Sequence, residues 1–427
     1  MRNFKTTSFA VTVLLVAALS VTLASVQAQA GIVVTQFPVV TGENASGVAL
    51  SGNNIVWTEI VGSTGFAYNQ NIYGYNISTQ QAFPINTDEK VIWQPAMDLN
   101  TVVWGAWDRN GTSAASIYGY NTATQSAFTI VNTGNPSRSA ISGSTVVYTD
   151  IVGSSGIGSY NQNIYGYNLW NHQSYPINTQ GKVLSSLFID GNTVVWEAYD
   201  GVNPSGGATI YAYDIADNTT TAICATGKPG ALAISGDNVV WTDAVGSTGL
   251  STLSVIRGYN LGTSQHYNIT TQGKVLSDLH VDGDFVAWEA FDRGNGNSQA
   301  SIYSYSYTGQ AITTICDTGS PVSLAMTDRR IVWTDIVGHD GFATLRNIYC
   351  YDFGWGETFA INTDSKVIWT PIIDGNTVVW GAYDNGYQAT IYGATISHLP
   401  EPGTIVMIAL SATGFAGTIV RRLRKRG

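Results

Sequence analysis

A lysine, an aromatic residue and an aspartate recur together every 92 residues, and the four copies of this set could bind a ligand. Each lysine of one series is followed at a fixed distance by an aromatic residue and then by an aspartate. Aromatic rings beside amines and carboxylates suit stacking on sugar rings with hydrogen bonds to the hydroxyls. The candidate ligand-binding residues are Lys90, Lys182, Lys274, Lys366, Trp107, Tyr199, Phe291, Tyr383, Asp108, Asp200, Asp292 and Asp384.

The same periodicity also has a purely structural interpretation. Periodic positions of a repeat protein serve the repeat itself, so the lysines and acids could pair between neighbouring repeats while the aromatic rings pack between them. A second series of acids follows the signature aromatic of the odd repeats by two residues: Glu59, Asp150, Asp243 and Asp335. The sequence leaves both interpretations open.

Eight repeats position these side chains. Each contains a turn such as Ser-Gly-Asn-Asn or Asp-Gly-Asn-Thr followed by Val-Val-Trp or a close variant. An Ile-Tyr-Gly-Tyr-Asn type of signature follows in seven repeats, repeat five departs from it at Arg257, and three copies add a third signature of the type Phe83-Pro84-Ile85-Asn86. About four short β-branched and aromatic runs bounded by turn residues predict antiparallel strands, and four strands in 40–50 residues is typical of a β-propeller blade. The signature aromatics are Trp57, Trp104, Tyr148, Trp196, Trp241, Trp288, Trp333 and Trp380.

The predicted fold class is therefore all-β, an eight-bladed β-propeller built from four two-blade modules of about 92 residues over residues 31–397. The last repeat has no fourth strand of its own, whereas residues 34–41 copy the fourth-strand pattern of residues 81–87. An N-terminal strand that completes the last blade would close the ring and remove a free edge. The four lysines should lie in the loops that enter the innermost strands of the even repeats.

The repeat Asp-Gly-Asn-Thr-Val-Val-Trp, followed by an acid and by Asn-Ile-Tyr-Gly-Tyr-Asn, resembles the TolB-like propeller repeats of exported and surface-layer proteins. The resemblance extends over nearly all of the chain between its two terminal segments. It implies the propeller fold, but it does not select a function, because that group includes periplasmic scaffolds, surface proteins, lyases and gating domains of peptidases.

The two ends predict export and membrane sorting. Residues 1–30 have a basic start, an apolar run and small residues near Ala28 and Ala30, which is the pattern of a secretory signal peptide. Residues 398–427 contain Pro400, Glu401 and Pro402, then an apolar run long enough to span a bilayer and a basic tip.

This C-terminal order resembles the PEP-CTERM sorting signal of diderm bacteria. The resemblance implies processing by an exosortase-type sorting protease, a membrane helix before processing, and a final place at the cell envelope, the surface or the extracellular matrix. A plain C-terminal membrane anchor is the alternative, and whether the helix is cleaved or retained stays open.

Composition and charge limit the partners. The chain has 427 residues, 46 of them glycine, and a formal net charge of -10. Seven of the 19 basic residues lie in the terminal segments, which leaves 12 against 29 acidic residues. Nucleic acid is an unsuitable partner for such an acidic body.

Chemistry that needs a cofactor has little support. The five histidines are scattered without a His-Glu-x-x-His pair, and the three cysteines form no Cys-x-x-Cys motif, so no metal site is predicted. The loops that begin at Asp108 and Asp292 suggest at most weak Ca²⁺ binding, because they lack the usual order of ligands.

These observations predict an exported propeller without a catalytic role, which binds extracellular polysaccharide or an envelope protein as a module or scaffold. The alternative is a carbohydrate-active lyase or hydrolase that uses acids of the loop face, and a third possibility is a structural coat component. Catalysis usually needs unlike groups in separate roles, so the nearly unbroken periodicity favours binding. Departures from the repeat at Arg257, His280 and His339 mark where catalysis should be sought.

Overall fold

The computed structural model describes residues 26–29, 31–64, 67–93, 95–107, 115–156, 159–199, 207–224, 227–248, 251–270, 272–293, 299–327, 329–341, 343–369, 371–384 and 388–398. Within these ranges the chain forms strands and turns, and no helix there is long and apolar enough to cross a membrane. The predicted sorting signal lies outside the described residues except His398. Of the predicted signal peptide only β1 is described.

Every repeat consists of β-strands, which are numbered in chain order. The N-terminal segment forms β1 (Val26–Gln29) and β2 (Ile32–Glu43). Repeats one to three form β3 (Ala45–Ser51), β4 (Asn54–Thr64), β5 (Ala67–Asn76), β6 (Gln81–Ile92), β7 (Ala96–Asp98), β8 (Thr101–Trp107), β9 (Ser116–Asn121), β10 (Ser126–Val131), β11 (Pro136–Ser142), β12 (Thr145–Gly156), β13 (Ser159–Asn168) and β14 (Gln173–Asp190). Repeats four and five form β15 (Thr193–Tyr199), β16 (Ala208–Asp214), β17 (Thr219–Cys224), β18 (Pro229–Ser235), β19 (Asn238–Thr248), β20 (Ser251–Asn260) and β21 (Gln265–Asn268). Repeats six to eight form β22 (Val275–Asp282), β23 (Phe285–Arg293), β24 (Gln299–Ser306), β25 (Ala311–Cys316), β26 (Pro321–Thr327), β27 (Arg330–Asp340), β28 (Ala343–Asp352), β29 (Glu357–Ile368), β30 (Ile372–Asp374), β31 (Thr377–Asp384) and β32 (Gln388–His398).

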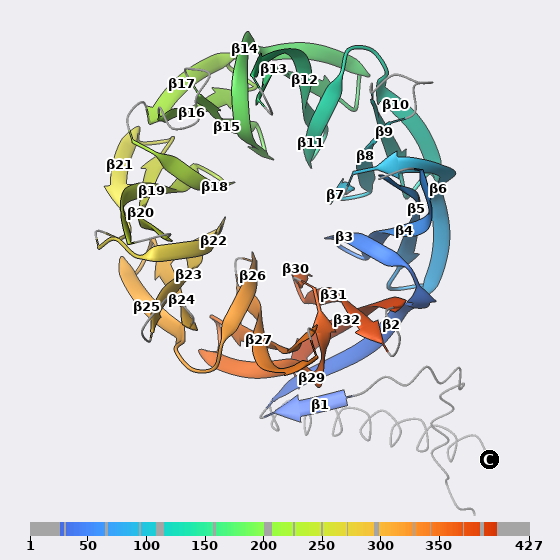
Figure 1. Ribbon diagram of the computed structural model, residues 1–427, viewed down its shortest axis with the longest axis vertical. Coiled ribbons are helices and arrows are strands. Elements are labelled where there is room, and N and C mark those ends of the chain that lie inside the picture. The colour runs from blue at the N-terminus through green and yellow to red at the C-terminus, as the bar shows by residue number, and fades with distance from the viewer. Residues whose placement is uncertain are drawn as a thin grey trace, which may run out of the picture.

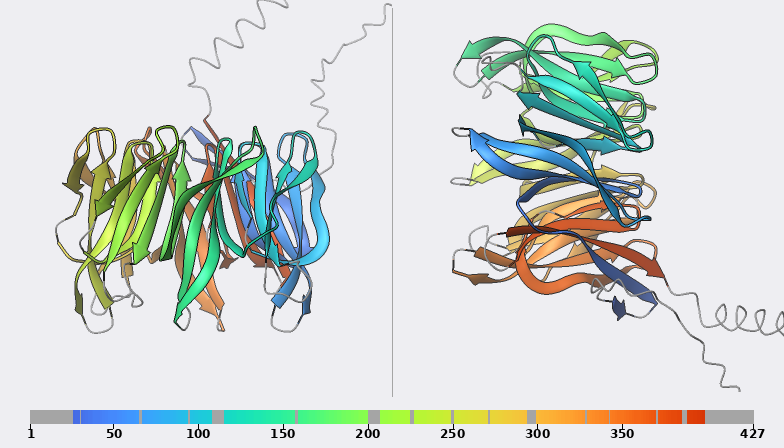
Figure 2. Two further views of the ribbon diagram at one scale, coloured as in Figure 1. Left: turned by 90° about the horizontal axis from the view of Figure 1, so that it is seen from above. Right: turned by 90° about the vertical axis from the view of Figure 1, so that its right-hand side faces the viewer.

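The described strands pair antiparallel in five sheets, none of which closes on itself. The sheets stand around a common centre, with β3, β7, β11, β18, β22, β26 and β30 nearest to it (Figure 1). Seen from the side, the strands run from one face of the molecule to the other, so the turns gather on two opposite faces (Figure 2). The fold is therefore all-β with sheets arranged radially, as the repeats predict.

The Val-Val-Trp signature forms the core because it lies in the second strand of each repeat, between two neighbouring sheets. In β8, Val102, Val103 and Trp104 are all buried. The indole of Trp104 stacks on Tyr118 of the adjacent strand, with ring centroids 5.8 Å apart. Six other repeats have the equivalent stacked pair, and repeat five replaces the tyrosine by Arg257.

Arg257 is explained without catalysis. It lies opposite Trp241 across the β19–β20 pair, and its Nε is 2.7 Å from Oδ2 of Asp243. The carboxylate of Asp243 is buried, so the ion pair satisfies a charge that the usual tyrosine would leave without this partner.

The glycine of Ile-Tyr-Gly-Tyr-Asn allows an aromatic side chain of the fourth strand to lie over the third. A Cβ added to Gly74 would be 2.4 Å from the ring of Phe83. The N-terminal segment repeats this arrangement, because a Cβ added to Gly393 would be 2.5 Å from the ring of Phe37. β2 pairs antiparallel with β32, so it occupies the fourth-strand position beside the last repeat, which confirms the predicted pairing.

The prediction that the four lysines lie in loops is wrong for three of them. Lys90, Lys182 and Lys366 lie inside β6, β14 and β29, which continue from the outer strand of one repeat toward the next. Lys274 precedes β22 and forms an isolated bridge with Ser254.

An asparagine on the third strand explains why these connections stay extended. The side-chain oxygens of Asn71, Asn163 and Asn347 each accept a hydrogen bond from the backbone N–H of the residue where the outer strand bends. Those bend residues, Glu89, Gly181 and Ser365, have φ between 53° and 61°. Repeat five has Val255 at the asparagine position, and there β21 ends six residues before Lys274.

Candidate functional site

The structure places the predicted lysines beside the core of their even repeats. Lys366 Nζ donates a hydrogen bond to the Tyr392 hydroxyl at 3.0 Å and lies 4.7 Å from the centre of that ring. Lys90 and Lys274 line two separate cavities, each together with the stacked Trp–Tyr pair of its repeat. All four lysines are half-buried. Both interpretations of the lysine series stay predictions.

Other predicted residues fall partly outside the described chain. Asp108, Asp200, Pro400, Glu401 and Pro402 lie outside the described residues. Asp292 and Asp384 lie at the ends of β23 and β31, and their side chains are not among those described. Their binding roles therefore stay predictions.

Three of the four acids of the odd repeats have a structural function. Oδ1 of Asp150 accepts a hydrogen bond from the Asn135 backbone N–H at 2.5 Å, and Asp243 and Asp335 accept the equivalent bonds at 2.9 and 2.6 Å. A Cβ added to Gly134 would be 2.7 Å from the Asp150 carboxylate. These acids hold the turn that enters the innermost strand of their own repeat.

A cavity of about 770 Å³ lies where repeats two, three and four meet, and we call it the aromatic pocket. Its walls come from the ends of β8 and β11, from the β12–β13 hairpin and from the inner part of β14. β11 to β14 belong to one seven-stranded sheet (Figure 1). Most of the residues that line the cavity therefore come from a single sheet. The lining residues are Trp93, Trp107, Asn135, Pro136, Ser137, Arg138, Ser139, Ile151, Tyr160, Ser185, Ser186, Leu187 and Phe188.

Three large aromatic side chains of this pocket are open to solvent. Trp107, Tyr160 and Phe188 are 49%, 50% and 40% exposed. The ring of Trp107 is held edge-on against Trp93, with centroids 5.4 Å apart and planes at 69°. Exposed rings fixed around a cavity of this size, together with serine hydroxyls, suit a ligand with apolar faces and polar edges, and sugars have that form.

Two charged side chains adjoin the pocket through Ser185. Arg138 is exposed in the pocket, and its Nη1 donates a hydrogen bond to the Ser185 carbonyl. The Ser185 hydroxyl donates to Oε2 of Glu197, which is buried behind the wall. Oε1 of Glu197 is buried without a hydrogen-bond partner. Burial raises the pKa of Glu197, and the hydrogen bond from Ser185 partly offsets that rise.

Among the described residues, Arg138 and Phe188 of the aromatic pocket are not repeated in the other repeats. The strand pairings place Gly47, Ala231 and Ser323 at the position of Arg138, and Ala96, His280 and Ile372 at the position of Phe188. Of the pocket residues only Trp107 was predicted. The signal for Arg138 and Phe188 was their departure from the repeat. Trp93 and Tyr160 recur as Trp369 and Tyr68.

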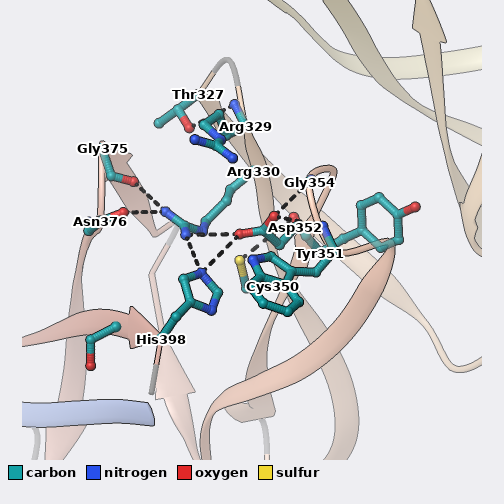
Figure 3. Close-up of polar contacts among 12 residues, drawn as sticks. Thr327, Arg329, Arg330, Cys350, Tyr351, Asp352, Gly354, Gly375, Asn376 and His398 are labelled. Carbon is teal, nitrogen blue, oxygen red and sulfur yellow. Dashed lines mark hydrogen bonds and ion pairs between the residues drawn. The ribbon is translucent and has the colours of Figure 1, made fainter. Parts of the chain in front are cut away.

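A second buried cluster of charges joins repeats seven and eight (Figure 3). Arg330 Nη2 is 2.8 Å from Oδ2 of Asp352, and both side chains are almost fully buried. Nη1 of Arg330 donates to the carbonyl of Gly375 and to Oδ1 of Asn376 in the β30–β31 turn. Repeats one and five have a pair of asparagines at the positions of Arg330 and Asp352. Because its charges pair internally, this cluster is a brace between neighbouring sheets.

No metal site emerges in the part of the chain that the structure describes, where no three His, Cys, Asp or Glu side chains are placed to hold an ion. The loops considered for Ca²⁺ begin at residues whose side chains are not described, so that possibility stays a prediction.

Comparison with known proteins identifies the fold class. No family model matches the chain, and no curated protein is similar to it in sequence. The β-propeller domain of the Trilobed protease from Pyrococcus furiosus is similar in structure, with a TM-score of 0.52 and 11% identity over 76% of this chain and 99% of that one. Oligogalacturonate lyase from Vibrio parahaemolyticus gives 0.51 and 11% over 84% and 99%.

A third similar structure is the acylaminoacyl peptidase of Pyrococcus horikoshii, with a TM-score of 0.51 and 11% identity. The chain covers 58% of that peptidase, and 81% of the chain is matched. These similarities show a fold of the β-propeller type, and at such identity they show nothing about activity.

Proposed function

We propose that this protein is an exported eight-bladed β-propeller that binds extracellular carbohydrate and acts as a scaffold at the cell envelope or in the extracellular matrix. The observation that carries the proposal is the aromatic pocket, where Trp107, Tyr160 and Phe188 remain open to solvent around a cavity of about 770 Å³. In a soluble domain, exposed aromatic rings gathered in one cavity indicate binding.

The eight blades and the closed ring are supported by the N-terminal strand. Four strands per repeat require a fourth strand for repeat eight, and β2 pairs with β32 there. Phe37 lies over Gly393 as Phe83 lies over Gly74, so β2 has the side-chain pattern of a blade's outer strand. A ring completed in this way leaves no unpaired outer edge on β32.

The place of action follows from the terminal segments. The signal peptide of residues 1–30 would export the chain, and Pro400, Glu401 and Pro402 would direct it to a sorting protease of the exosortase type. Carbohydrate or an envelope protein would then be the partner that an acidic propeller meets outside the cell.

The test compares saccharide binding by the full-length chain and by variants. We expect Trp107→Ala and Tyr160→Ala each to weaken binding of polysaccharide fragments about threefold to tenfold, because one ring contact contributes ~0.5–1.5 kcal/mol. Trp170→Ala is the matched control, since Trp170 is 83% exposed and does not line the pocket. Equal binding by all variants, measured by calorimetry, would reject the pocket as the carbohydrate site.

One observation favours the alternative function, a carbohydrate-active enzyme. Glu197 is buried behind Ser185 with a raised pKa, and this is a property of general acids. If the alternative is correct, Glu197→Gln abolishes the shortening of a polysaccharide incubated with the protein while its binding remains. If no shortening occurs with the unaltered protein, binding is the function.

A further inference from the structure

Arg138 differs from Arg257 and Arg330, which both pair with a carboxylate. Arg257 pairs with Asp243, and Arg330 pairs with Asp352 (Figure 3). Arg138 donates to the Ser185 carbonyl, and no carboxylate among the described residues pairs with it. None of the described residues that line the aromatic pocket is acidic. Although the chain has ten more acidic than basic residues, the described lining of this pocket therefore contains a positive charge and no negative one.

The repeat does not require this arginine. The equivalent positions in the other odd repeats are Gly47, Ala231 and Ser323, and the neighbouring strands pair there in the same way. An interaction that held the sheets together would be expected to recur at those positions. The charge of Arg138 is therefore better explained by a ligand than by the fold.

The geometry around Arg138 defines the ligand's chemistry. A guanidinium has five N–H donors in a planar fork that matches a carboxylate, and the Ser185 carbonyl occupies only one of its nitrogens. Exposed rings of Trp107, Tyr160 and Phe188 line the same cavity, as do Ser139 and Ser186. A ligand that fits all of these has a carboxylate, a ring with an apolar face, and hydroxyl groups.

We propose that the aromatic pocket binds a saccharide containing uronic acid, with the sugar carboxylate paired to the guanidinium of Arg138. This inference rests on the proposed carbohydrate-binding function and specifies its ligand class. The rings of Trp107 and Tyr160 hold the sugar ring, and Arg138 distinguishes an acidic sugar from its neutral counterpart.

The experiment uses two matched probes, a short oligouronate and the same oligosaccharide with its carboxyl groups reduced to alcohols. The full-length chain should bind the oligouronate at least tenfold more tightly, because a hydrogen bond to a charged group contributes about 1.5–3 kcal/mol. Arg138→Gln should remove that preference and leave binding of the reduced probe within about twofold. Arg138→Lys should restore part of it, and Arg329→Gln, which alters an exposed arginine outside the pocket, should change neither probe.

The outcomes separate this inference from the proposed function. If both probes bind equally and Trp107→Ala weakens both, the carbohydrate site stands and the role of Arg138 is wrong. If Arg138→Gln weakens both probes equally while thermal unfolding is unchanged, Arg138 shapes the pocket without selecting charge, which also overturns the inference. If neither probe binds but a peptide rich in glutamate does, both proposals fail and the ligand is an acidic protein segment.

Discussion

The even repeats fill one equivalent position in two different ways. In repeats two and eight, Trp93 and Trp369 lie against Gly105 and Gly381 of the second strand. In repeats four and six, Ser185 and Ser277 occupy the tryptophan positions, and their hydroxyls donate to Glu197 and Glu289. The glycines and glutamates are equivalent, because each pairs with the isoleucine that begins the Ile-Tyr signature of its repeat.

In each even repeat the residue on the second strand and the residue that packs against it depend on one another. A Cβ on Gly105 would be 1.4 Å from a ring carbon of Trp93, so no larger residue fits while the indole is there. A carboxylate in the glycine position needs a small partner that can donate a hydrogen bond, and serine provides it. Repeats two and eight are thus apolar at this position, repeats four and six hold buried acids there, and the aromatic pocket lies between repeats two and four.

The largest effect on stability is expected from disrupting the contact between Trp93 and Gly105. Gly105→Ala should lower the free energy of unfolding by about 3 kcal/mol, because the added methyl overlaps the indole and overpacking of this kind is costly. Urea-induced unfolding monitored by tryptophan fluorescence measures the change. In a Trp93→Ser background the same substitution should cost less than about 1 kcal/mol, since the clashing ring is absent.

Gly62→Ala is the matched control for this substitution. Gly62 also lies in a second strand, and an added Cβ meets nothing within 4 Å. A large effect at both glycines would show that strand backbone conformation, and not the indole contact, is responsible.

The recurring strand signatures predicted most of the fold, whereas the residues that set the connections and the pocket were missed. The Val-Val-Trp and Ile-Tyr-Gly-Tyr-Asn signatures located the strands, and the pattern of residues 34–41 located β2 beside β32. The loop position predicted for three of the lysines was wrong, because Asn71, Asn163 and Asn347 keep the connections extended. They do so through hydrogen bonds that periodicity alone does not specify. Arg138 and Phe188 were missed because their surroundings come from three repeats, so only the folded chain brings them together.

An intermediate effect should follow from the buried acids and depend on pH. Burial, the charge of Asp278 and a hydrogen bond with it raise the pKa of Glu289 from 4.5 to about 7. The folded state therefore holds a proton that the unfolded state releases above pH 4.5. This contribution to stability is complete below about pH 4.5 and is lost as the pH rises through 7.

Glu289→Gln should accordingly remove the loss of stability that accompanies the rise in pH. We expect the variant to gain about 1–2 kcal/mol relative to the unaltered chain between pH 5 and pH 8, measured by urea unfolding at both pH values. Glu357→Gln, at an exposed glutamate, is the control and should leave the pH dependence unchanged. Parallel pH profiles for Glu289→Gln and the unaltered chain would mean that this carboxyl is already ionised in the fold.

The smallest effect is expected from the periodic lysines, which lie on the connections into both kinds of even repeat. Lys366→Gln removes a hydrogen bond and a cation–π contact with Tyr392, so unfolding should become easier by about 0.5–1 kcal/mol. Changing all four lysines to glutamine should leave saccharide binding within about twofold, because none of them lines the aromatic pocket. Lys228→Gln, at an exposed lysine of an odd repeat, is the control for charge alone. A quadruple variant that unfolds normally but loses saccharide binding would transfer the site from the aromatic pocket to the lysine series.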